Sequence, residues 1–173
     1  MSGADPAERL ASLGLTLPPV VPPVAAYVPA VLTGNHVYVS GQLPMAFGKL
    51  LATGKVGAEV SVEEATKLAA RCALNALAAA NSVVGINNIR KVIKVNGFVA
   101  SAPGFNGQPT VINGASELFG EVFPSEGGHA RSAVGVAELP LGAPVEVDVI
   151  FEVNPSIDIA SVTATLTAMP KPD

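Results

Sequence analysis

Hydrophobic positions recur at helical spacing most clearly in the middle of the chain. Residues 61–84, SVEEATKLAARCALNALAAANSVV, place apolar and small side chains three or four positions apart, so one broad face of the segment is apolar. This spacing is typical of a helix that packs on other elements. Ser61 and Glu64 predict a capping box at its start, in which each side chain binds a free backbone N–H.

Alternating apolar and polar positions predict strands on both sides of this helix. Residues 36–44 and 89–99 alternate in this way, and residues 129–153 contain two valine-rich runs separated by a Pro/Gly loop. Helices are also predicted over residues 7–13 and 109–123. The main order is strands, helix, strand, helix, strand, strand. It predicts an α+β fold with two helices on one face of a mixed sheet.

The alternation also sorts the side chains of residues 129–153 by face. On the first strand Val134 falls on one face, and Arg131 falls on the other with small residues such as Gly135. We expect the valine faces to pack against the helices and Arg131 to lie next to a strand that carries Glu146. A guanidinium fork beside a carboxylate can bind a substrate carboxylate and hold a water. A simple cross-strand ion pair is the structural alternative.

Composition predicts one domain that associates with copies of itself. The 173 residues are enough for one domain with a real core. Apolar residues make up 49% of the chain and charged residues 14%, and the mean hydropathy is +0.46. Extra apolar surface of this kind is often covered by self-association. We therefore expect an oligomer.

The charge pattern disfavours nucleic acid as a partner. The net charge is −4 and the pI is about 5.1, and the lysines and arginines are scattered along the chain. A nucleic-acid-binding protein needs clustered cations to neutralise phosphates. The acidic balance thus counts against a general nucleic-acid binder.

Cysteine, histidine and proline positions exclude other classes. A lone cysteine, Cys72, rules out a disulfide within the chain, and the distant His36 and His129 form no metal-ligand cluster, so we expect no structural metal. Residues 10–48 carry no charged side chain but contain prolines that interrupt a membrane-spanning helix. No secretory signal is evident, and we expect a cytoplasmic protein without a membrane partner.

Two stretches carry a resemblance to a known family. YVPAVLTGNHVYVSGQLP, residues 27–44, and ARSAVGVAELPLGAPVEVDVIFEV, residues 130–153, resemble the signature regions of the Rid/YjgF family of reactive intermediate deaminases. The family is also labelled endoribonuclease L-PSP or translation initiation inhibitor. The resemblance implies a chorismate-mutase-like α+β fold and a homotrimer with sites in clefts between subunits. It also implies hydrolysis of 2-imino or enamine acids to 2-keto acids and ammonia, without a cofactor.

The same resemblance assigns roles to single residues. Arg131 would bind the substrate carboxylate, and Glu146 would position the attacking water. The other candidates would line the pocket: Tyr27 from a neighbouring subunit, Ser40, Gly41 and Asn113. Each has a plainer interpretation, respectively an interface aromatic, a solvent-facing serine, a strand bulge and an exposed helix position. For Asn113 we favour the plainer one.

The chain departs from the family pattern around the arginine. Many members have a cysteine two positions after it, where this chain has Ala133, and the run SEGGHARS is longer and richer in glycine than its counterpart. His129 could face the pocket on the same side as Arg131, although a loop histidine is the simpler expectation. These departures leave the substrate open.

We expect three segments and keep three functions open. The segments are a Pro-rich arm over residues 1–26, a YjgF-like domain over residues 27–154 and an extension over residues 155–173, in which residues 162–166 could form a strand. The first function is hydrolysis of small imino acids. The second is a trimeric protein that binds a small carboxylate-bearing metabolite without turnover, and the third, which the acidic pI disfavours, is an endoribonuclease or translation inhibitor.

Overall fold

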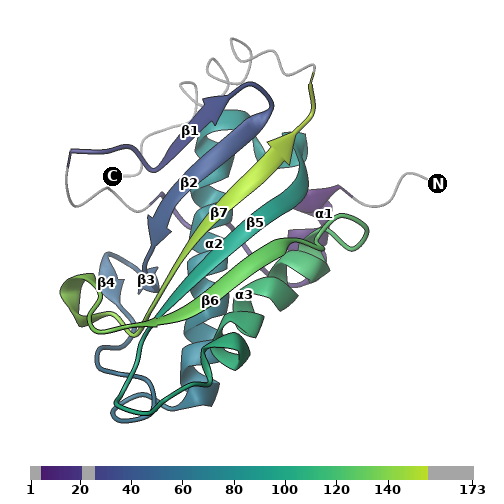
Figure 1. The fold of residues 1–173 in the computed structure, drawn as a ribbon. Helices are drawn as coiled ribbons and strands as arrows, with labels where there is room; N and C mark the ends of the chain where they lie inside the picture. The colour runs from purple at the N-terminus through teal and green to yellow at the C-terminus, as the bar shows by residue number, and fades with distance from the viewer. Residues whose placement is uncertain (1–4, 21–25, 156–173) are drawn as a thin grey trace.

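A five-stranded mixed sheet forms the centre of the computed structural model, which describes residues 5–20 and 26–155. Two long helices, α2 (Val62–Val84) and α3 (Gln108–Val122), lie side by side behind one face of the sheet (Figure 1). The predicted α+β class is confirmed. The strands lie in the order β1 (Ala30–Thr33), β2 (His36–Gln42), β7 (Val145–Val153), β5 (Ile89–Ala100) and β6 (Ala130–Val136).

The pairing of the strands makes the sheet mixed. β5 and β6 run parallel, because α3 connects them as a crossover, and every other neighbouring pair is antiparallel. The smaller elements are α1 (Pro6–Ser12), the short pair β3 (Met45–Ala46) and β4 (Lys49–Leu50), and two short 3₁₀ turns, η1 (Ile86–Asn88) and η2 (Pro140–Gly142).

The start of α2 only partly matches the predicted capping box. The Ser61 hydroxyl accepts a hydrogen bond from the Glu64 backbone N–H at 3.1 Å, but within the described residues Glu64 does not return a bond to Ser61. A complete box instead caps α1, where Asp5 and Glu8 bind each other's backbone N–H groups. At the predicted end of α2, Gly85 has a φ of +75° and closes the helix.

The core lies between the helices and the two central strands. The inward positions of β7 alternate as predicted, and each of them, from Val145 to Val153, is at most 1% exposed. Phe151 packs edge-on against Phe119 of α3, with ring centroids 5.7 Å apart. Full burial of each such side chain contributes about 1.5–3 kcal/mol.

Two glycines allow α3 to approach both α2 and the sheet closely. A Cβ on Gly114 of α3 would overlap the backbone carbonyl of Thr66 in α2, and a Cβ on Gly97 of β5 would overlap the side chain of Ile112. α3 therefore packs against both α2 and the sheet at distances that no larger residue permits at these two positions.

The face assignment predicted for β6 is wrong. Val134 is 45% exposed on the open face of the sheet, whereas Ala133 packs against the core. In register, Arg131 aligns with Val95 of β5 and through it with Val149 of β7, and both valines are fully buried. Arg131 therefore lies on the face that the helices cover.

The predicted adjacency of the last two strands is wrong as well. β5 lies between β6 and β7, so the strand with Arg131 does not neighbour the strand with Glu146. The link through η2 crosses the end of β5, because Val136 pairs with Ala100 and Val145 pairs with Val99. Alternation shows which residues share a face, but it shows neither which face is covered nor which strand is the neighbour.

The part of the N-terminal arm that the structure describes packs on the domain. Leu10 of α1 is 3% exposed, and the Arg9 side chain donates two hydrogen bonds to the Glu121 carbonyl at the end of α3. The strand predicted over residues 162–166 lies outside the described residues. In the described ranges, no helix combines the length and the hydropathy that crossing a membrane requires.

We expect two glycine substitutions on α3 to act in opposite directions. Gly114→Ala should lower the free energy of unfolding by about 1–3 kcal/mol, because its Cβ meets the backbone of α2. Gly120→Ala, with nothing within 4 Å of its Cβ, should raise it by about 0.5–1 kcal/mol, because alanine favours the helix. Urea denaturation at one protein concentration measures both. Equal effects would mean that the close approach of α2 and α3 does not govern stability.

Candidate functional site

Glu146 and Gly41 form one part of the predicted site, on the open face of the sheet. β2 shifts its register against β7 between Val39 and Gln42, and Gly41 lies in this irregularity. A Cβ on Gly41 would overlap the Glu146 carboxylate. The glycine is therefore not only a bulge residue, because its missing side chain makes the space that the carboxylate fills.

Ser40 ties the chain before β1 to the same region. Its hydroxyl donates to the Val28 carbonyl at 2.7 Å, and its backbone N–H donates to the Pro29 carbonyl at 2.9 Å. These bonds hold the segment that begins with Tyr27, whose side chain is 44% exposed. The chain thus brings Ser40, Gly41 and Glu146 together, and it presents Tyr27 at the surface, one residue before the Val28 carbonyl that Ser40 binds.

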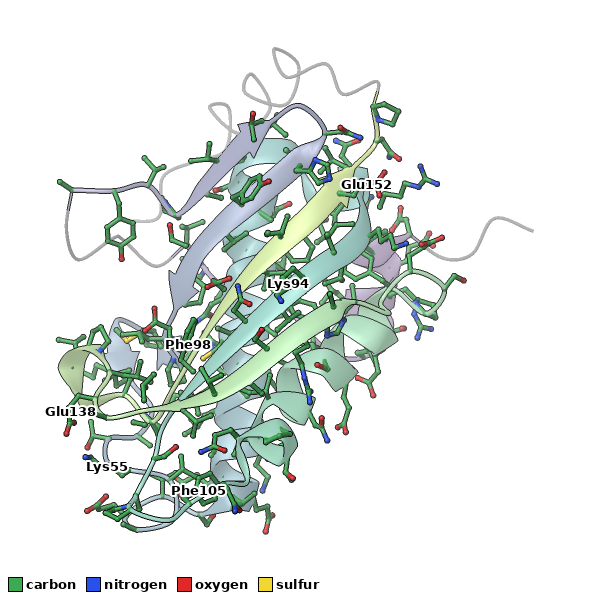
Figure 2. All side chains as sticks on the ribbon, viewed as in Figure 1. Lys55, Lys94, Phe98, Phe105, Glu138 and Glu152 are labelled. Atoms are coloured by element: carbon green, nitrogen blue, oxygen red, sulfur yellow. The ribbon has the colours of Figure 1, made fainter. Side chains whose placement is uncertain are left out.

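The carboxylates of β7 are electrostatically unusual. Partial burial raises the pKa of Glu146 from its ordinary value of 4.5, and the nearby Asp148 carboxylate raises it further. Burial also raises the pKa of Asp148, although a 2.8 Å hydrogen bond from Asn96 and the charge of Lys94 oppose this rise. Figure 2 shows Lys94 and Phe98 on this open face, on the side of the sheet away from the helices.

Arg131 lies in a different environment, against α3. Its Nη1 donates to Asn113 Oδ1 at 2.8 Å and to Ser116 Oγ at 3.2 Å, and its Nη2 donates to the Pro109 carbonyl at 3.4 Å. An exposed helix position was the favoured interpretation for Asn113. The residue is exposed, but it also contacts Arg131 directly.

The contacts with α3 leave part of the guanidinium group available. Arginine has five N–H donors, and within the described residues the Nε of Arg131 makes no hydrogen bond. The edge formed by Nε and Nη2 can therefore donate to both oxygens of a carboxylate. α3 fixes the direction in which this edge points.

His129 lies in the loop before β6, as expected, and it also contacts Ser116, which in turn contacts the arginine. The ring Nδ1 lies against the Gly127 carbonyl, and Nε2 lies 2.9 Å from Ser116 Oγ. A carbonyl can only accept, so Nδ1 carries a proton, and in the corresponding neutral tautomer Nε2 accepts from the serine hydroxyl. The serine oxygen then faces Arg131 as an acceptor.

Ser116 was missed by sequence reasoning, although a signal was present. It follows Asn113 by three positions on α3, and residues three apart share a helix face. The tie between α3 and β6 could not be read from the sequence, because it depends on which face of β6 points at the helix.

The two parts of the site lie on opposite faces of one sheet. Arg131 shares the register of buried Val149, whereas Glu146 pairs with Phe98, which itself pairs with the exposed Val134. Both the common hollow that we expected within one chain and its alternative, a cross-strand ion pair between Arg131 and Glu146, are therefore wrong.

Comparison with known proteins identifies the family. The family model described as endoribonuclease L-PSP matches residues 19–153. The chain belongs to the endoribonuclease L-PSP family. The Rid/YjgF resemblance found in the signature motifs is thereby confirmed.

Among the relatives of this L-PSP protein, one has a name that states an enzymatic activity and others do not. Protein TCP17 of Trypanosoma cruzi is 43% identical over 86% of this chain and 94% of its own length. A 2-iminobutanoate/2-iminopropanoate deaminase of Dermatophagoides farinae is 35% identical over 79% of this chain and 93% of its own length. A crystal structure of a protein of unknown function from Agrobacterium tumefaciens is 49% identical, with a TM-score of 0.80 over 86% of this chain and 92% of that one.

We expect Asp148→Asn to lower the pKa of Glu146, because it removes the neighbouring negative charge and keeps an acceptor for Asn96. Carboxyl-carbon NMR titration measures this pKa directly.

The same substitution has a consequence for stability. A carboxyl group whose pKa is raised in the folded state stabilises the fold at low pH and loses this contribution as the pH rises through that pKa. The ordinary pKa values are 3.8 for Asp148 and 4.5 for Glu146. As the pH rises above these values, the free energy of unfolding should therefore decline less steeply in Asp148→Asn than in the wild type. An unchanged Glu146 titration would show that the two carboxylates do not interact.

Proposed function

We propose that this L-PSP family protein hydrolyses small 2-imino acids to 2-keto acids and ammonia, in clefts between the subunits of a homotrimer. The observation that carries the proposal is the separation of Arg131 and Glu146 on opposite faces of the sheet. A substrate that needs both groups must lie between two chains, with the arginine from one and the glutamate from the other. Cyclic homo-oligomers repeat such a contact around a closed ring.

Two further observations support the proposal. A relative 35% identical over most of its length is a 2-iminobutanoate/2-iminopropanoate deaminase. The open surface of β1 and β2 also exposes large apolar side chains, with Val31 50% and Tyr38 47% exposed. Exposed apolar surface of this kind favours association.

The proposed reaction uses Arg131 for binding. The Nε–Nη2 edge binds the substrate carboxylate, and the hydrogen bonds that Nη1 donates to Asn113 and Ser116 keep the guanidinium group in place. The imine carbon, one bond from the carboxylate, then lies next to Glu146 of the neighbouring chain. Holding substrate and water in this geometry removes much of the entropic barrier to their reaction.

Glu146 moves the protons in this mechanism. It accepts a proton from water as the water oxygen bonds to the imine carbon, and it passes that proton to the nitrogen. It then takes the proton of the new hydroxyl group and delivers it to the nitrogen as the C–N bond breaks, so that ammonia leaves and the keto group forms. A raised pKa suits a group that both accepts and donates protons near neutral pH.

Single substitutions should separate the two roles. Glu146→Gln should lower kcat by about 10²–10⁴-fold with little change in KM, because it removes the proton carrier. Arg131→Lys should raise KM by about ten- to a hundredfold, because lysine keeps the charge and loses a two-point contact that is worth about 1.5–3 kcal/mol. Arg90→Lys, an exposed arginine at the start of β5, is the matched control. Keto-acid release from an imine generated in solution measures all three.

Mixing two inactive variants tests whether the site is shared between chains. Arg131→Ala and Glu146→Gln chains, unfolded and refolded together in equal amounts, should recover about a quarter of wild-type activity, since one site in four then combines an intact arginine with an intact glutamate. Each variant refolded alone is the control and should stay inactive. No recovery from trimers shown by mass spectrometry to be mixed would contradict the shared site.

The alternative function is binding of a carboxylate-bearing metabolite without turnover. If the wild-type trimer binds 2-keto acids at Arg131 in calorimetry but does not accelerate imine hydrolysis, this alternative replaces the enzyme. The endoribonuclease function that the family label suggests is disfavoured by the net charge of −4. A cytoplasmic location stays a prediction.

A further inference from the structure

A second arginine, Arg71 of α2, lines an apolar cavity whose lining includes neither Arg131 nor Glu146. The cavity has a volume of about 410 Å³ and lies between the N-terminal arm, the β3–β4 hairpin and α2. This is within the range of about 300–1,000 Å³ that is usual for small-molecule sites. Its lining residues are Thr16, Leu17, Pro18, Pro19, Val20, Met45, Phe47, Gly48 and Arg71.

The guanidinium group of Arg71 is held at the wall of this cavity. Its Nε donates to the Met45 carbonyl at 2.7 Å, and Asn75, one turn further along α2, donates to the carbonyls of Leu43 and Met45. The terminal nitrogens of Arg71 make no hydrogen bond or ion pair within the described residues. Among the residues that the structure describes, no aspartate or glutamate lines the cavity. An anchored positive charge thus lacks a negative partner there.

Apart from Thr16, the other residues that line the cavity are apolar, and one of them is unusual. Phe47 is fully exposed and has a φ of +51°, followed by Gly48 at +73°, which makes a two-residue hairpin turn. Asn-Gly and Asp-Gly suit this turn, and a phenylalanine is strained in it. An aromatic ring held at the rim of a cavity by a strained backbone contributes nothing to the core of its own chain.

We propose that this cavity binds an amphipathic monocarboxylate, with its carboxylate on Arg71 and its apolar body against Leu17, Val20 and Phe47. Charge selects the head group, because a guanidinium edge donates to both carboxylate oxygens and no acidic residue in the lining competes. The apolar walls select a hydrocarbon tail. This site is separate from the proposed reaction, since Arg131 belongs to β6 and Arg71 to α2.

Calorimetry with octanoate tests the proposal. Octanoate should bind, and octylammonium and octan-1-ol should bind at least tenfold more weakly. From hexanoate to octanoate the affinity should rise about fourfold for each added methylene group, as each is transferred from water to the apolar walls. Equal binding of the three head groups would overturn the proposal, as would no heat of binding at millimolar octanoate.

Variants locate the bound octanoate. Arg71→Met should weaken binding at least tenfold, Arg71→Lys should weaken it less, and the matched control Arg90→Met should leave it unchanged. Arg131→Ala should also leave octanoate binding unchanged, which separates this cavity from the site of the proposed imine hydrolysis. Methyl NMR should show octanoate-dependent shifts at Leu17 and Met45. Loss of binding in Arg131→Ala but not in Arg71→Met would overturn the proposal.

The Phe47→Asn variant distinguishes a loss of octanoate binding from a loss of folding. Asparagine before Gly48 suits the hairpin turn better than phenylalanine, so thermal stability should stay the same or rise. Octanoate affinity should nevertheless fall several-fold, because the aromatic wall is lost. An unchanged affinity in a stable Phe47→Asn variant would contradict the part assigned to this ring.

Discussion

α2 and α3 both cover the same face of the sheet, and the rest of the structure depends on how closely they do so. Gly114 brings α3 onto the backbone of α2, and Gly97 brings it onto β5. The inward valines and phenylalanine of β7 are buried in the layer that results. Because both helices take this face, the opposite face of the sheet has no cover from its own described chain, and it carries Phe98, Tyr38 and the carboxylates of β7 (Figure 2).

This one-sided packing also determines what each functional group can reach. Arg131 points to the helix side, where Asn113, Ser116 and the Pro109 carbonyl of α3 hold its guanidinium group. Glu146 points to the open side, over Gly41. The sheet separates Arg131 from Glu146 within one chain. A reaction that needs both groups must therefore use one from each of two chains. In the proposed function, the position of a single arginine thus makes the activity depend on assembly.

Contacts within the chain hold both groups in place. His129 orients Ser116, Ser116 faces Arg131, and Gly41 leaves the space that the Glu146 carboxylate fills. Such preorganisation means that little rearrangement is needed on binding. Arg71 is held in the same way, because the hydrogen bond from its Nε to the Met45 carbonyl fixes the direction of its terminal nitrogens.

The sequence by itself determined the helix over Val62–Val84, the buried face of Val145–Val153, the order of elements and, through its two signature stretches, the family. These follow from local spacing, which a linear pattern records. Only the tertiary structure decided that β5 separates β6 from β7, that Arg131 faces α3 and that Ser116 belongs to its surroundings. The physical reason is that alternation along a strand shows which residues share a face, but it does not show which of the two faces is buried. On an edge strand of small residues and valines, the packing of neighbouring elements alone chooses which side turns inward.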